Sequence, residues 1–104
     1  MKPRVTVCTR ADGTFEILLN EAGRDLMVKE LQRLDRTWDH FHLDYYADPD
    51  IANATDVVLS PIPYRDDDTV LQNGKVLLRP DDWDQQYFPH VVGKSGLDGP
   101  MSTP

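Results

Sequence analysis

The sequence predicts one α+β domain, in which a four- to five-stranded, mostly antiparallel sheet carries one helix packed on one face. Three observations predict it: short runs alternate apolar and polar residues, one run has helical spacing, and turn residues separate them. The expected order is strand, strand, helix, strand, strand, strand. Residues 1–92 would form the domain, and residues 93–104 a flexible C-terminal tail.

The first two strands are expected to form a hairpin. Residues 4–9 alternate β-branched and polar side chains, and residues 14–19 place Phe15, Ile17 and Leu19 on one face. The dipeptide Asp12-Gly13 tolerates positive φ and closes tight turns. The pattern therefore predicts two antiparallel neighbours joined by a short turn.

A helix is predicted from about Glu21 to Asp35. Asn20 can cap it, because its side chain can accept a hydrogen bond from a free amide of the first turn. Gly23 weakens the helix slightly. Apolar residues recur at helical spacing and are expected to face the core. They are Ala22, Leu26, Met27, Leu31 and Leu34.

The segment from Trp38 to Tyr46 alternates and is rich in aromatic residues, which predicts a third strand. One of its faces would carry Phe41, Leu43 and Tyr45. Because one helix covers only one face of a sheet, the second face is expected to be open to solvent, to the C-terminal segment or to a partner. That face would carry Trp38, His40, His42, Asp44 and Tyr46.

The remaining strands are expected between residues 55 and 79. The pattern of residues 55–60 predicts a fourth strand, which ends at Pro61. Residues 70–72 and 75–79 flank Asn73-Gly74, which predicts a second hairpin. The run 66–68 of three aspartates is interpreted as a solvated acidic turn, and no regular element is expected beyond Pro80.

The composition limits the kinds of macromolecule that this chain is expected to bind. The 104 residues carry 18 acidic and 11 basic side chains, a net charge of −7 that repels nucleic acid and would attract a basic protein. No signal peptide or membrane span is indicated. Cys8 is the only cysteine, which precludes an intrachain disulfide and suits the cytoplasm. A monomer is expected, or a weak homodimer formed through an exposed strand edge.

Two histidines give the only hint of a metal site. On a strand, His40 and His42 point to one side with Asp44 next in the row, a set that suits zinc or iron if a third ligand comes from elsewhere. The alternative is a pair of histidines that faces a partner. Cys8 lies in an apolar strand, and Asp39 and Asp44 point to opposite faces, so no nucleophile or acid–base pair is indicated. We therefore expect neither enzyme activity nor a cofactor, with a metal-binding protein or metal-dependent enzyme as the alternative.

Three segments carry a resemblance to a known family. Residues 20–26, 29–34 and 39–43 read Asn-Glu-Ala-Gly-Arg-Asp-Leu, Lys-Glu-Leu-Gln-Arg-Leu and Asp-His-Phe-His-Leu. In these segments, and more weakly at 70–76, the chain resembles the immunity protein 32 family of bacterial polymorphic toxin systems. The resemblance implies a small cytoplasmic protein that binds and neutralises a cognate toxin.

The charge of this chain would suit a basic toxin, such as a nuclease, whose active site it occludes. Hot spots of protein interfaces combine aromatic anchors with surrounding polar groups. The expected toxin-binding residues are therefore those of the open face: Trp38, His40, His42, Asp44 and Tyr46. A small cytoplasmic domain of some other function remains a further alternative.

Overall fold

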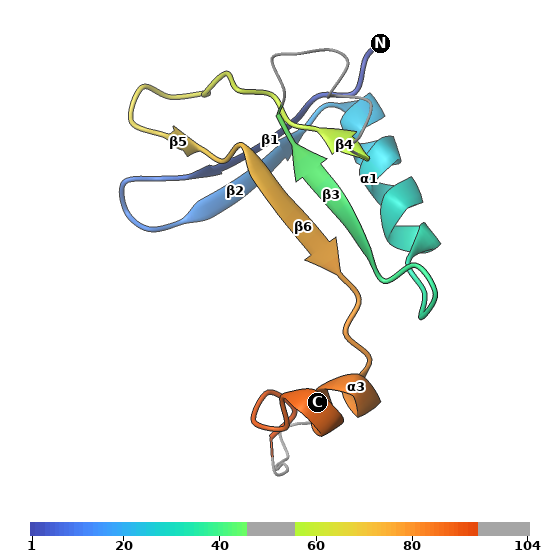
Figure 1. Cartoon of the computed structure of the whole chain (residues 1–104). Helices are drawn as coiled ribbons and strands as arrows, with labels where there is room; N and C mark the ends of the chain where they lie inside the picture. The colour runs from blue at the N-terminus through green and yellow to red at the C-terminus, as the bar shows by residue number, and fades with distance from the viewer. Residues whose placement is uncertain (46–55, 94–104) are drawn as a thin grey trace.

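The computed structural model describes residues 1–45 and 56–93 and confirms the α+β class (Figure 1). Its elements are β1 (Val5–Thr9), β2 (Phe15–Leu19), α1 (Glu21–Arg33), β3 (His40–Asp44), β4 (Val57–Val58), β5 (Thr69–Val70), β6 (Asn73–Leu77) and α3 (Asp81–Tyr87). Within the described ranges, no helix is long and apolar enough to cross a bilayer. Residues 94–104, which make up most of the predicted tail, lie outside these ranges.

The strands form two three-stranded sheets instead of one sheet of four to five strands. One has the order β2-β1-β5 with antiparallel pairs, and the other has the order β4-β3-β6, in which β3 is parallel to β4 and antiparallel to β6. A single parallel bridge between Val5 and Leu59 joins them, with a 2.8 Å hydrogen bond from the Ser60 N–H to the Val5 carbonyl. β4 is only two residues long, and the junction that follows it is one bridge and not a ladder.

The first hairpin and the helix are confirmed. β1 and β2 pair from Val5 opposite Leu19 to Thr9 opposite Phe15, and Gly13 in the turn has a φ of 90°. The side chain of Asn20 accepts a 2.7 Å hydrogen bond from the Gly23 N–H, as expected of an N-cap. The helix ends at Arg33, two residues before the predicted end at 35.

The core lies between α1 and the line along which the two sheets meet. Its buried members are Val5, Phe41, Leu43, Val57 and Leu59, against which Leu26, Met27 and Leu34 pack. The apolar stripe of α1 is therefore only partly internal, since Leu31 is 48% exposed. The expected apolar face of β2 is likewise left uncovered: Phe15, Ile17 and Leu19 share a face but are exposed.

The second face of the first sheet is covered by the segment that leads from β4 to β5. Thr6 and Cys8 are fully buried, and the segment reaches Cys8 through Asp68, whose Oδ2 lies 3.8 Å from Sγ. The Asp68 side chain is wholly buried and accepts a 3.1 Å hydrogen bond from Arg65 Nε. The prediction of a solvated turn is therefore wrong for Asp68. Burial and the Asp68 charge raise the pKa of the Cys8 thiol, which fits a packing role.

The prediction of a second hairpin is wrong. Asn73 and Gly74 lie inside β6, where Gly74 stands opposite Leu43 of β3, while β5 pairs with β1. Between β5 and β6 the chain passes from one sheet to the other. The Leu71 N–H donates a hydrogen bond to the first sheet, and the Gln72 carbonyl accepts one from the second. Long-range pairing outweighs the local turn preference of Asn73-Gly74, because β6 forms a five-residue ladder with β3.

A second helix, α3, occupies the region expected to be irregular. Three aspartates in its first turn complement the helix dipole, a signal that could have predicted it. α3 stands apart from both sheets (Figure 1). Arg36 binds Asp82 through both guanidinium Nη atoms, at 3.0 and 2.8 Å, and Arg79 Nε donates to Asp84 at 2.9 Å.

Candidate functional site

The candidate site is one face of β3 and its neighbours. Phe41 and Leu43 point into the core with 0% and 6% exposure, so His40, His42 and Asp44 point the other way, each partly exposed. The two faces predicted for this strand are confirmed within residues 40–44. Trp38, just before the strand, is 48% exposed. Tyr46 lies outside the described residues.

Rings follow one another along this face. The Trp38 and His40 rings are nearly parallel, with centroids 6.5 Å apart and an interplanar angle of 2°. The His40 and His42 rings meet edge to face at 5.1 Å. From the last turn of α1, the Arg33 guanidinium lies 4.8 Å from the Trp38 ring centroid, a cation–π distance. The Trp38 end of the ring row is therefore packed against the end of the helix.

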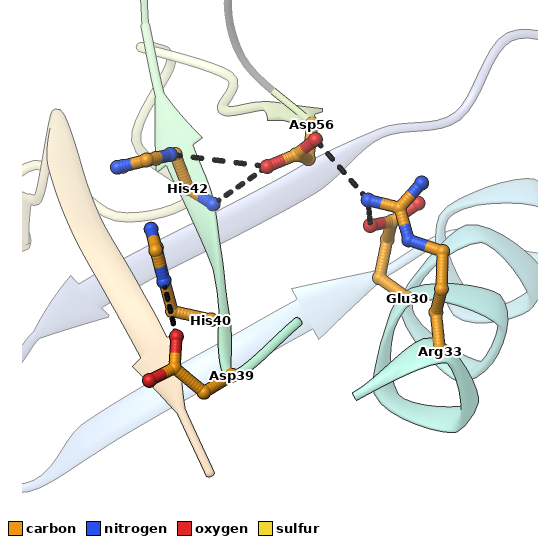
Figure 2. A network of polar contacts seen from close by, with 6 residues as sticks. All are labelled: Glu30, Arg33, Asp39, His40, His42 and Asp56. Carbon is orange, nitrogen blue, oxygen red and sulfur yellow. Dashed lines mark hydrogen bonds and ion pairs between the residues drawn. The ribbon is translucent and has the colours of Figure 1, made fainter. Parts of the chain in front are cut away.

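Each histidine contacts a carboxylate (Figure 2). His40 Nδ1 lies 2.8 Å from Asp39 Oδ1, and it donates a hydrogen bond when Nδ1 carries the proton. The His42 backbone N–H donates to Asp56 Oδ2 at 3.0 Å, and His42 Nδ1 is 3.9 Å from the same oxygen. The hydrogen bond from His40, assisted by its charge, holds the pKa of Asp39 below the usual range.

Asp56 also connects the strand to α1. Its Oδ1 lies 3.4 Å from Arg33 Nη2, and the same Nη2 forms an ion pair of 2.8 Å with Glu30 Oε1 (Figure 2). Glu30 is only 4% exposed, and Arg33 is the cation that it faces in this ion pair. None of these three residues was expected in the site from the sequence. The Glu30–Arg33 spacing of i,i+3 was visible, but nothing local indicated that Asp56 would reach the helix.

β6 contributes a second row to the same face. Asn73, Lys75 and Leu77 stand opposite Asp44, His42 and His40, and directly opposed side chains share one side of a sheet. Leu77 is 53% exposed, so it adds apolar surface beside the rings. We call the combined surface the β3 face. Its members are Trp38, His40, His42, Asp44, Asn73, Lys75 and Leu77.

The structure does not assemble a metal site on this face from the described residues. Within residues 1–45 and 56–93, no three His, Cys, Asp or Glu side chains are grouped so as to hold an ion. His40 and His42 each contact a different carboxylate, Asp39 and Asp56. His90, the third histidine, lies near α3, where its ring centroid is 6.4 Å from that of Phe88.

We expect the His40→Ala variant to raise the pKa of Asp39 toward the ordinary range of an aspartate, because it removes the hydrogen bond that lowers it. Because the folded-state pKa is depressed, ionised Asp39 favours the folded state above its unfolded pKa, and this contribution is lost as pH falls through the folded pKa. The variant should therefore show less of this acid dependence. A carboxyl-detected NMR titration measures the shift. His90→Ala is the control, and an Asp39 titration unchanged by His40→Ala would contradict the assignment.

Comparison with known proteins gives no relative from which a role could be transferred. No protein-family model, no curated protein and no solved structure matches the chain. The residues of the β3 face and the chemistry they present are consequently the only guide to a role.

Proposed function

We propose that the chain is an immunity-type binding protein, which neutralises a cognate basic toxin by covering its active site with the β3 face. The observation that carries the proposal is the row of half-exposed rings at Trp38, His40 and His42, held from one side by α1. Aromatic side chains with polar tips are enriched at the energetic centres of protein interfaces. The row offers such anchors next to Leu77.

The contacts behind the rings favour binding because they restrict side chains before a partner arrives. Arg33 packs on Trp38, Asp39 holds the His40 ring, and Asp56 fixes the His42 backbone. Immobilising a free side chain on binding costs about 0.5–1.5 kcal/mol, so side chains that are already held lose less. The β3 face is accordingly a surface on which binding energy can be concentrated.

The net charge and the sequence resemblance both support a basic toxin as the partner. The net charge of −7 attracts a basic protein over long range and raises its association rate. The segments that resemble immunity protein 32 sequences include His40 and His42 of the ring row. They also include Arg33 and Asp39, which contact the Trp38 and His40 rings, but not Trp38 itself. A toxin encoded beside the gene of this chain is therefore the first partner to test.

We expect Trp38→Ala and His42→Ala each to weaken binding to that toxin about thirtyfold, the size of a typical hot-spot loss of about 2 kcal/mol. Isothermal calorimetry measures the dissociation constant, and the toxin's enzymatic assay measures neutralisation. His90→Ala, a histidine change outside the β3 face, should leave both unchanged. If the toxin binds but every variant retains wild-type affinity, the β3 face is the wrong surface. If the toxin is neither bound nor inhibited, the immunity function itself is wrong.

A further inference from the structure

β2 has an open edge. It is the terminal strand of its sheet, and no described strand pairs with its outer side. Thr14 accepts a 2.7 Å hydrogen bond from the β1 side, and Asn20 donates one of 3.2 Å to that side. In an antiparallel ladder, the backbone groups of successive residues point to alternate sides. The N–H and C=O groups of Phe15, Ile17 and Leu19 therefore point outward.

The side chains of the same three residues are uncovered. Phe15, Ile17 and Leu19 are 66%, 50% and 39% exposed. Natural edge strands usually carry a lysine, a proline, a bulge or an inward charge that prevents pairing with another chain. β2 has none of the first three, since its five residues pair in unbroken register with β1. Its only charge, Glu16, lies on the opposite face against Arg65.

α1 extends this apolar surface beside the strand. A hollow of about 340 Å³ is lined by residues of the β2 end and the first turns of α1, including Ile17, Leu19 and Arg24. Val28 and Leu31 follow Arg24 at spacings of four and three residues, so they continue the same side of the helix. They are 45% and 48% exposed. The uncovered surface therefore consists of the β2 edge and the hollow beside it, and Val28 and Leu31 follow farther along α1.

We propose that this surface is the interface of a homodimer, in which β2 pairs antiparallel with β2 of a second copy about a two-fold axis at Ile17. In this register Ile17 faces its own copy, and Phe15 faces Leu19 of the other. The backbone N–H and C=O groups of all these residues point outward, so the two residues of each opposed pair exchange two backbone hydrogen bonds. The two three-stranded sheets join into one six-stranded sheet. Phe15 of the second copy then lies beside Leu19 and enters the hollow.

The pattern of the strand favours a second copy over a different protein. The three outward residues are apolar and symmetric about Ile17, and the polar pair Thr14 and Asn20 lies opposite beyond them, so no like charges are opposed. Two copies that each carry a charge of −7 repel at long range, and salt screens that repulsion. The dimer is accordingly expected to strengthen as salt is added.

Sedimentation equilibrium on the full chain tests the interface. We expect a concentration-dependent dimer whose dissociation constant falls on going from low to physiological salt. Ile17→Lys should raise that constant about tenfold or more, because it opposes two charges and removes an apolar contact at the axis. Ile62→Lys is the matched control, since Ile62 is 70% exposed and lies on the β4–β5 segment. A chain that stays monomeric, or a dimer indifferent to Ile17→Lys, overturns the proposal.

Cross-linking tests the register without weakening the contact. Directly opposed, hydrogen-bonded residues have Cα atoms about 5.5 Å apart, within the range a disulfide needs. Ile17→Cys should therefore yield a covalent dimer on oxidation, whereas Leu19→Cys and Ile62→Cys should not. Cys8 is fully buried and does not interfere. Equal cross-linking of all three variants contradicts the two-fold axis at Ile17. Toxin binding reports on the β3 face of the other sheet, so the two proposals fail separately.

Discussion

The Phe41→Ala variant is expected to lose about 3–5 kcal/mol of unfolding free energy, the usual loss for a buried phenylalanine. Phe41 is the largest fully buried side chain, with 0% exposure, and it lies among Val5, Leu43 and Val57. Truncation leaves a cavity between α1 and β3. The unfolding free energy of a natural domain is about 5–15 kcal/mol in total, so this loss would remove a large share of the stability. Urea denaturation followed by circular dichroism measures the change.

Phe88→Ala is the matched control for that experiment. Phe88 follows α3 and is 48% exposed, so its truncation should change the unfolding free energy by less than about 1 kcal/mol. Phe41→Leu keeps most of the buried volume and should lose less than about 1.5 kcal/mol, which covers the case in which Phe41→Ala does not fold. Equal losses for Phe41→Ala and Phe88→Ala would show that the core has been placed incorrectly.

We expect Gly23→Ala to destabilise the protein by about 1–3 kcal/mol, against the general rule for helices. In an exposed helix, replacing glycine with alanine raises the unfolding free energy by about 1 kcal/mol. At Gly23, however, an added Cβ would lie 2.3 Å from the Arg4 carbonyl oxygen and 3.0 Å from its carbon. Those are backbone atoms, and Arg4 N–H is itself bound to the Asn20 side chain at 2.9 Å. The chain entering β1 would have to move, and the cap with it.

Gly74→Ala distinguishes a steric clash from a general effect of removing glycine. A Cβ at Gly74 would meet no atom within 4 Å, so this variant should be neutral or should gain up to about 1 kcal/mol. Both variants can be compared by thermal unfolding under one buffer condition. If Gly23→Ala were as stable as Gly74→Ala, the close approach of Arg4 to the helix would not be a feature of the folded protein.

Some residues of the candidate site could be predicted from local sequence and others could not. Alternation placed His40 and His42 opposite Phe41 and Leu43, because the period of two in a strand does not depend on what the strand pairs with. The partners Asp56, Lys75 and Leu77 come from more than thirteen residues away and depend on which strands meet. The local Asn73-Gly74 signal favours a hairpin turn, which is incompatible with the register in which Gly74 stands opposite Leu43.

By itself, the sequence determined the elements whose causes are local: the β1–β2 hairpin with its turn at Gly13, the Asn20-capped helix, and the two faces of β3. Only the tertiary structure decided which apolar faces are covered, since the burial of Leu31 or Ile17 depends on what packs against it. It also divided the strands between two sheets and buried Asp68 beneath Arg65. The physical reason is that dihedral preferences and caps act within a few residues, whereas strand pairing and burial are settled by competition among distant segments.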